Sequence, residues 1–475
     1  MKKALSKKNL WEKTPPLVKA TVGRGLGIFP LAFLLGKKFK ENRRFIQDAQ
    51  WWQVDQVRDY QLKRLQEILK LAYEKTKFYR RTFESIGFHP NDFQSLDCIN
   101  RLPTIDKQVV IENLSDMCIG PVTNRDIDYT STGGTSGTPL HFYMNAGRSA
   151  IEYAYLTTSW ERAGYKLGMP MAVLRGRIVE PDKNGLRHEY DPILRHHYYS
   201  NFHMTNENIQ LYLEHIRTIG PCILHAYPSS AHAVANYIIK TGQPAPQNVN
   251  GILLESENVY PDQIIDIEKT FAAKTFSCYG HSEKLILAVQ CEHTRDYHVW
   301  PTYGYFELLD ADGEPVRKAG QEGEIVGTGF INTIVPFIRY RTGDYATYVD
   351  ERCRACGREH TLITDIKGRW PQGWLVGIDG AVVSMTALNV HDDTFQNVRE
   401  YQFHQSTPGK ATLCVVPIIT LDENERNRIV ANMNKRLQGQ VVLDLEICTE
   451  LIKTARGKQP RVIQNCVASI PHAEA

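Results

Sequence analysis

Short apolar runs alternate with helical segments between residues 171 and 278, and this alternation restricts the fold more than any other feature of the chain. Apolar runs lie at 171–174, 222–225, 251–254 and 275–278, and the spacing predicts helices at 205–219, 229–240 and 261–272. Short strands that are mainly apolar are typical of a parallel sheet that is covered on both faces. We therefore predict an α/β domain around a buried parallel sheet.

Polar turns follow three of these strands, at residues 225–228, 255–257 and 279–283. The carboxyl ends of parallel strands meet at one edge of the sheet, and ligands of such sheets bind there. We therefore expect the three turns to contribute to one binding site.

A glycine-rich stretch, residues 131–139, precedes this region and holds three glycines and five hydroxyl residues. We expect a strand before it, at 126–130, and a helix after it, at 146–160. Glycines let backbone N–H groups approach an anion closely, and the hydroxyls add donors, so the stretch predicts a phosphate-binding loop. It is not a Walker A loop, because no Lys-Ser/Thr pair follows the last glycine at the required spacing. The alternative is a flexible linker.

The segments on either side of this region have different patterns. Residues 41–120 have helical periodicity, with Thr104 as the expected N-cap of one helix. From residue 303 the pattern changes to alternating strands at 305–309 and 323–327, followed by the Arg- and Tyr-rich stretch 336–344.

The chain becomes rich in Gly and Trp after residues 367–369, and we place a domain boundary there. The domains are then 1–366 and 367–475, and the second is a small α+β unit with strands at 411–417 and 441–447, a helix at 422–437 and a basic loop at 453–461.

Composition excludes some classes of protein. The net charge of +3 gives no electrostatic case for nucleic acid as a partner. The ten cysteines form no dense framework and no cleavable signal peptide is evident, so a cytoplasmic protein with reduced thiols is the default. The apolar segment 25–36 is shorter than the ~20 residues that a transmembrane helix needs. We expect it to be buried or packed on the surface, and a peripheral membrane contact is the alternative.

Five motifs, taken in order, resemble those of the adenylate-forming ligase superfamily. Within it they are most similar to the phenylacetate–CoA ligase-like branch, and closest to its capsular polysaccharide biosynthesis members. The motifs are the glycine-rich loop, Tyr279–Glu283, Tyr340–Asp344, Gly368–Arg369 and Gly457–Lys458. The resemblance implies a large multi-layer N-terminal domain with parallel sheets and a β-rich subdomain, joined to a small, mobile α+β domain that carries a catalytic lysine loop.

The activity that this resemblance implies is ATP-dependent activation of a small carboxylic acid. The acid forms an acyl-adenylate with release of pyrophosphate, and the acyl group then passes to CoA or to an amine or hydroxyl of a glycan precursor. Lys458 would bridge the attacking carboxylate and the α-phosphate, Glu283 would bind Mg²⁺, and Arg341 would support the ribose contacts. The residues that would bind ATP or AMP are Thr132, Gly133, Gly134, Thr135, Ser136, Gly137, Glu255, Ser256, Glu257, Tyr279, Gly280, His281, Ser282 and Asp344.

The chain departs from the family pattern at the hinge. The family usually continues from Gly-Arg to paired aspartates, whereas residues 370–374 here read Trp-Pro-Gln-Gly-Trp. Proline fixes its own φ and restricts the residue before it. Because this part of relatives also shapes a CoA tunnel, CoA and a glycan precursor both remain open as acceptors.

A Cys-x-x-Cys pair, Cys353 and Cys356, follows Cys291 and His298 in the sequence. Three sulfurs and one imidazole suit a tetrahedral structural Zn²⁺, and some relatives in this branch carry a similar set. We predict these four residues as zinc ligands; the alternative is reduced cysteines without a metal.

A rival interpretation is a non-catalytic protein of a polysaccharide pathway, stabilised by zinc, that binds nucleotide or assists assembly. Glu283, Asp344 and Lys458 are all present, which favours the enzyme because a decayed enzyme would be expected to lose at least one of them.

Overall fold

The computed structural model of the chain describes residues 25–26, 29–120, 127–131, 140–368, 373–385, 388, 394–452 and 460–466. Its N-terminal part is helical, as the periodicity predicted. The segments are α3 (Leu31–Leu34), α4 (Gly36–Ala49), α5 (Val54–Lys75), α6 (Lys77–Ser85), the 3₁₀ helices η1 (Pro90–Asp92) and η2 (Leu96–Arg101), and α7 (Lys107–Met117). α5 buries Leu65, Ile68, Leu69 and Ala72 along one face.

The apolar segment near the N-terminus is partly packed and partly exposed. Leu31 is buried, whereas Phe29 and Phe33 are 47% and 61% exposed. Within the described ranges, no helix is long and apolar enough to cross a membrane. The alternative to packing, a peripheral membrane contact, is not tested by these contacts.

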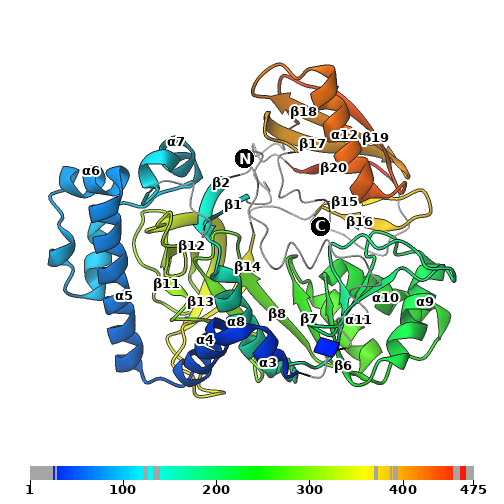
Figure 1. The fold of residues 1–475 in the computed structure, drawn as a ribbon, viewed down its shortest axis with the longest axis horizontal. Helices are drawn as coiled ribbons and strands as arrows, with labels where there is room; N and C mark the ends of the chain where they lie inside the picture. Colours follow the sequence, from blue (N-terminus) through cyan, green and yellow to red (C-terminus); the bar gives the residue numbers. More distant parts are fainter. Residues whose placement is uncertain are drawn as a thin grey trace.

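A twelve-stranded sheet forms the centre of the large domain (Figure 1). Its strands, in spatial order, are β11 (Gly304–Leu309), β12 (Glu322–Gly329), β13 (Tyr340–Asp350), β14 (Leu362–Lys367), β10 (Tyr297–Val299), β9 (Leu287–Gln290), β8 (Thr275–Gly280), β7 (Val249–Glu255), β6 (Cys222–Ala226), β3 (Met171–Leu174), β5 (His196–Tyr199) and β4 (His188–Asp191). The neighbours from β8 to β5 pair in parallel, and the others pair antiparallel. The predicted parallel sheet is confirmed, and the β-rich part continues it.

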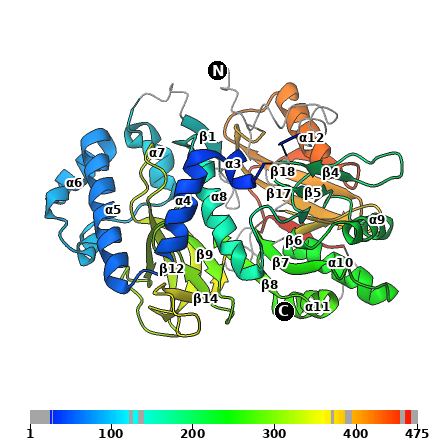
Figure 2. The same ribbon diagram turned by 60° about the horizontal axis from the view of Figure 1, so that its bottom comes forward.

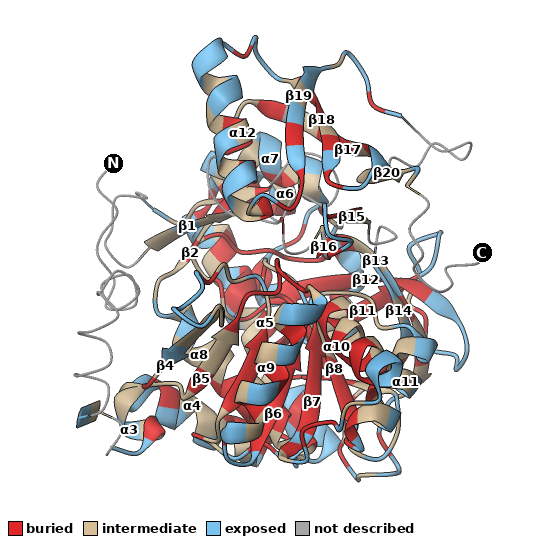
Figure 3. Ribbon diagram, turned by 90° about the vertical axis from the view of Figure 1, so that its right-hand side faces the viewer, coloured by how far each residue is buried: buried red, intermediate tan, exposed pale blue. Residues whose placement is uncertain are grey.

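Helices cover both faces of the parallel half of the sheet. One face packs on α9 (Asn206–Thr218), α10 (Pro228–Thr241) and α11 (Pro261–Phe271), and it receives Ala172 and Leu174 of β3 (Figure 3). Met171 and Val173 point to the opposite face and join the core beside Trp160, at the end of α8 (Arg148–Trp160). Because successive strand residues face opposite sides, both faces of a strand need apolar side chains here. This explains why the strands are mainly apolar rather than alternating between apolar and polar residues.

The glycine-rich stretch lies between two strands rather than between a strand and a helix. β1 (Ile127–Ser131) pairs antiparallel with β2 (His141–Asn145), and Ser131 lies opposite His141. The expectation that a helix follows directly was therefore incomplete, because α8 starts only after β2. The alternation of buried and partly exposed residues in β2 was the sequence signal for this second strand. Phe142 and Met144 are buried, and the other three residues of the strand are partly exposed.

The expected N-cap at Thr104 is wrong, because α7 starts later. Asp106 is the N-cap, and its carboxylate accepts the backbone N–H of Val109 at 2.9 Å. Ile105 lies in extended backbone and pairs with β13: its N–H donates to Arg339 O at 3.1 Å, and its O accepts from Arg341 N at 2.8 Å. This pairing keeps the chain extended up to Ile105, so the helix cannot begin at Thr104.

The described residues of the C-terminal part form two small sheets and one helix, which lie above the large domain in Figure 1. The elements are β15 (Trp374–Val376), β16 (Val382–Ser384), β17 (Val398–Thr407), β18 (Lys410–Pro417), α12 (Glu423–Leu437), β19 (Val442–Ile447) and β20 (Val462–Gln464). Phe202 and Tyr227 of the large domain reach into the core of this part. The boundary at 366/367 and the mobility of the small domain stay predictions.

Gly304 at the start of β11 is expected to be intolerant of any side chain. A Cβ atom there would lie 1.9 Å from Leu285 O and 2.9 Å from Thr328 O. Both are backbone atoms, which cannot move aside as the end of a flexible side chain can. Gly304→Ala should lower the free energy of unfolding by roughly 1–3 kcal/mol or more, as overpacking does. Urea unfolding measures the effect. Gly220→Ala is the control, because a Cβ meets nothing within 4 Å there; equal stability of the two variants would contradict the prediction.

Candidate functional site

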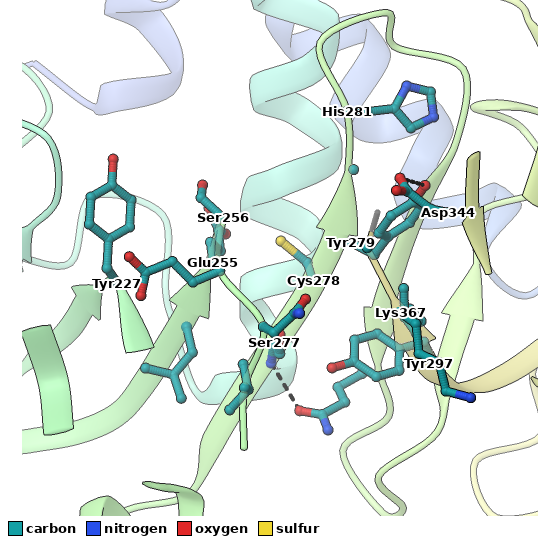
Figure 4. A pocket seen from close by; sticks show the side chains of 18 of the residues that line it. Tyr227, Glu255, Ser256, Ser277, Cys278, Tyr279, His281, Tyr297, Asp344 and Lys367 are labelled. Carbon is teal, nitrogen blue, oxygen red and sulfur yellow. Dashed lines mark hydrogen bonds between the residues drawn. The ribbon is translucent and has the colours of Figure 1, made fainter. Parts of the chain in front are cut away.

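A cleft of about 1320 Å³ lies at the carboxyl ends of β6, β7 and β8. It is lined by the three predicted polar turns, which contribute Tyr227, residues 255–257 and residues 279–283, and also by Asp344 of β13 (Figure 4). Tyr401, Phe403 and Arg461 of the C-terminal part also line it. Its volume exceeds the ~300–1,000 Å³ typical of a pocket for one small ligand. The cleft thus has room for more than one substrate group.

Tyr279 and Asp344 meet in this cleft from different strands. The Tyr279 hydroxyl donates a hydrogen bond to Asp344 Oδ2 at 2.9 Å. Burial, and then the charge of Asp344, raise the pKa of Tyr279 well above its usual value, so the phenol keeps its proton. The carboxylate of Asp344 is therefore held in place by a neutral donor.

Glu283 is buried at the mouth of the turn after β8. The Tyr340 hydroxyl donates to its Oε1 at 3.4 Å, and His281 Nδ1 lies 3.3 Å from its Oε2. Both Glu283 and His281 line the cleft. A carboxylate oxygen in such a position is the kind of ligand that a hard cation prefers, so Glu283 fits Mg²⁺.

Arg341 is not among the described residues that line the cleft. Its guanidinium pairs with Glu324, with Nε 2.8 Å from Oε2, and this hydrogen bond raises the pKa of Arg341 further. The other oxygen of Glu324 accepts the N–H of Gly343 at 2.9 Å. Gly343 has φ = 73°, a conformation that glycine adopts without strain. Arg341 is therefore placed to hold the turn before Asp344, and its predicted catalytic part stays a prediction.

Glu255 at the end of β7 is the centre of a buried polar network. Its Oε2 lies 2.7 Å from Arg175 Nη1 and 3.1 Å from His225 Nε2, and Trp160 Nε1 donates to its Oε1 at 3.1 Å. Burial alone would raise the pKa of Glu255, but His225 and Arg175 hold it well below its usual value. Burial lowers the pKa of His225, so Arg175 is the counter-ion.

The neighbours of Glu255 lie in the same turn. Ser256 adopts a left-handed backbone with φ = 70°, and its Oγ accepts a hydrogen bond from Arg175 at 2.7 Å. Glu257 Oε2 accepts the backbone N–H of Ser229 at 3.0 Å, at the start of α10. These contacts orient the turn toward the cleft.

Arg175 is a site residue that no sequence motif assigned, and it directly follows the apolar run of β3. The rule that ligands gather at the carboxyl ends of parallel strands would have pointed to it. His225 lies near the end of β6, within the turn 225–228 that was expected to contribute to the site. Lys367 and Tyr297 also line the cleft (Figure 4).

Several predicted site residues lie outside the described part of the chain: Thr132, Gly133, Gly134, Thr135, Ser136, Gly137 and Lys458. On either side of residues 132–139, Ser131 pairs with His141 and Leu140 is fully buried in the core.

The four predicted zinc ligands come together away from the cleft. The ligand atoms of Cys291, His298, Cys353 and Cys356 all lie within 4.8 Å of one another. The Cys291 and Cys353 sulfurs are 3.8 Å apart, and Cys356 Sγ is 3.5 Å from His298 Nε2. With Zn–S bonds of about 2.3 Å, two sulfurs of a tetrahedral site lie about 3.8 Å apart. The donor set and its spacing fit Zn²⁺.

The stability of the protein should depend on pH through His225 and Glu255. Because the folded pKa of His225 is lowered, the unfolded chain binds a proton first as the pH falls below about 6.5, and the folded state loses stability. The stabilising charge of Glu255 is present above about pH 4.5 and is lost only as the pH falls through its lowered folded pKa. We expect the urea midpoint to fall between pH 7 and pH 5, and to fall less steeply in His225→Gln. Parallel pH profiles for parent and variant would refute this.

No family model matches the chain. Its sequence is 24% identical to the protein CapK of Staphylococcus aureus over 416 residues, 86% of this chain and 89% of that protein. It is 23% identical to a phenylacetate-coenzyme A ligase of Pseudomonas putida over 430 residues, 88% of this chain and 96% of that protein. A crystal structure of 2-hydroxyisobutyryl-CoA ligase in complex with 2-HIB-AMP and CoA is similar at a TM-score of 0.56 and 21% identity, covering 88% of this chain and 92% of that chain. The chain is thus related in sequence to CapK and the phenylacetate-coenzyme A ligases, and it has the adenylate-forming ligase fold that its motifs predicted.

Proposed function

We propose that this protein is an ATP-dependent ligase that activates a carboxylic acid as an acyl-adenylate and then transfers the acyl group to coenzyme A. One observation carries the proposal: the turns after β7 and β8 and the Asp344 turn of β13 meet in one cleft at the carboxyl ends of parallel strands. In the first step a carboxylate oxygen bonds to the α-phosphorus of ATP, and the bond from that phosphorus to pyrophosphate breaks. In the second step the acyl group leaves AMP for the acceptor.

The nucleoside would bind between β8 and β13. The carboxylate of Asp344 accepts hydrogen bonds from the ribose hydroxyls, and the Tyr279 hydroxyl keeps that carboxylate in position at 2.9 Å. The Tyr279 ring lies against the adenine, beside residues 255–257. Arg341 acts through Glu324 and the N–H of Gly343, which together set the turn that carries Asp344.

The phosphates would bind between the large and small domains. Thr132 to Gly137 donate to the β- and γ-phosphates, and Glu283 would hold Mg²⁺, which neutralises phosphate charge when bound. Lys458 of the mobile domain 367–475 would then contact the α-phosphate, where charge develops during the attack. Positioned donors and cations supply most of the catalysis in phosphoryl and acyl-phosphate chemistry, because charge rather than covalent bonding is what the protein must stabilise.

Coenzyme A is the proposed acceptor because the phenylacetate-coenzyme A ligase and the 2-hydroxyisobutyryl-CoA ligase relatives carry that substrate in their names. The similarity to CapK supports an amine or hydroxyl of a glycan precursor as the second candidate. Release of AMP that depends on coenzyme A distinguishes the two, since a glycan acceptor would leave turnover unchanged on adding coenzyme A.

Pyrophosphate exchange with a panel of carboxylic acids tests the proposed first step. At least one acid should drive exchange of labelled pyrophosphate into ATP, and Lys458→Ala should slow that exchange by roughly 10²–10³, the cost of one lost electrostatic donor. Transfer from a synthetic acyl-adenylate should survive in Lys458→Ala. Lys410→Ala is the matched control, since Lys410 is an exposed lysine of the same domain that pairs with Asp444. Exchange by Lys458→Ala at the parental rate would remove Lys458 from the reaction, and a parent inert with every acid would favour the non-catalytic rival.

Asp344→Ala should weaken binding of ATP and AMP by about 10–100-fold, because it removes hydrogen bonds to a charged acceptor that are worth roughly 1.5–3 kcal/mol. The fold should persist. Asp350→Ala, at the far end of the same strand, is the control. Calorimetric titration with AMP measures the effect, and equal affinity in the two variants would place Asp344 outside the nucleotide site.

Cys291, His298, Cys353 and Cys356 would bind one structural Zn²⁺ per chain, which cross-links β9 and β10 to the turn after β13. Protein purified without chelator should contain zinc that Cys353→Ser loses, and removal of zinc should lower the melting temperature of the parent. Elemental analysis and thermal unfolding are the measurements. Equal zinc content in parent and Cys353→Ser would leave these residues as reduced thiols and an imidazole.

A further inference from the structure

Three histidines from three elements meet at the outer edge of the parallel half of the sheet. His188 lies on β4, His197 on β5 and His215 on α9, and one ligand nitrogen of each lies within 4.8 Å of the other two. The antiparallel register pairs His188 with Tyr199, and Tyr190 with His197, so both strand histidines are on one face. That face belongs to the core that α9 covers, and Figure 2 shows β4, β5 and α9 at the same end of the molecule.

We propose that His188, His197 and His215 form a binding site for a divalent transition-metal ion, and that this ion is Zn²⁺. Three imidazoles suit zinc and its neighbours such as Ni²⁺ and Cu²⁺, whereas Mg²⁺ and Ca²⁺ prefer oxygen ligands. Three protein ligands leave a fourth tetrahedral position for water. The site is independent of the cysteine cluster and of the proposed ligase reaction.

The distances and partners of the ring nitrogens support a metal. His188 Nε2 and His197 Nδ1 are hydrogen-bonded at 3.0 Å, so without a metal one ring donates its N–H to the other. This separation is close to the roughly 3.3–3.4 Å between two nitrogens around tetrahedral zinc, and a metal would take the place of that proton. His215 Nδ1 is hydrogen-bonded to the Tyr199 hydroxyl at 2.8 Å, which leaves Nε2 of that ring for a metal. Metal-bound histidines commonly have such a partner on the second nitrogen, because it fixes the tautomer and the ring orientation.

A metal at this position would anchor the edge of the sheet. Among the described strands β4 is the last of the sheet and pairs only with β5, so a bond to α9 would tie the hairpin to the helix layer. The segment from Arg175 in the cleft to β4 is tied by an ion pair between Arg177 and Glu189 of β4 at 2.8 Å. The metal would hold the far end of the segment that brings Arg175 to the site.

The test uses the full chain, freed of metal by a chelator and equilibrated with Zn²⁺, and with Co²⁺ as a spectroscopic probe. Co²⁺ bound to the cysteines gives a thiolate charge-transfer band, whereas Co²⁺ bound to three histidines gives only visible d–d bands. His188→Gln and His215→Gln should each lose one ion per chain relative to the parent and keep the thiolate band. His232→Gln is the matched control and should keep the parental stoichiometry, since His232 pairs with Asp266 on other helices.

Tyr199→Phe keeps all three ligands and removes only the hydroxyl that orients His215. We expect metal affinity at the histidine site to fall by about 10–100-fold in this variant, with the thiolate band unchanged. Far-UV circular dichroism verifies folding, and Tyr199→Phe decides the matter if the histidine variants do not fold. Parental ion content in His188→Gln, or unchanged affinity in Tyr199→Phe, would overturn the proposal.

Discussion

The continuous hydrogen-bonded ladder from β4 to β11 is the constraint on which the candidate site depends. Parallel pairing makes β6, β7 and β8 end at the same edge, so the turns that follow them must open into one space. The antiparallel half then brings β13 back to that edge, where the Tyr279 hydroxyl reaches Asp344 at 2.9 Å. No single strand carries a complete site, and the order of the strands assembles it.

Two buried carboxylates at or beside the site are held by arginines from other segments of the chain. Glu255 lines the cleft with Arg175 beside it, and Glu324 has Arg341 beside it and holds the turn before Asp344. Burying a carboxylate is costly unless its counter-ion and its hydrogen bonds are well placed. These contacts hold the charged side chains in fixed positions. Charged groups that are already in place stabilise the charge that develops during a reaction.

The two clusters of side chains that we propose as metal sites lie outside the cleft and differ in chemistry. Cys291, His298, Cys353 and Cys356 connect β9 and β10 with the turn after β13, and three of the four are buried. The three histidines are half-buried and sit at the free edge of the sheet. Each cluster joins segments that the backbone ladder alone does not hold together, which is the position where a metal cross-link adds most to a fold.

The sequence by itself determined the parallel strands and the polar turns that follow them. It also supplied the three thiols and one imidazole that suit a zinc ion. Apolar periodicity depends on neighbouring residues, and motifs such as Tyr340–Asp344 are contiguous, so both can be read without coordinates. Only the tertiary structure decided which distant groups meet: Glu324 beside Arg341, Arg175 and His225 beside Glu255, and three histidines on β4, β5 and α9. It also decided that Asp106 rather than Thr104 caps α7, because Ile105 pairs with β13. These contacts follow from strand order and register, which long-range packing sets and local sequence does not encode.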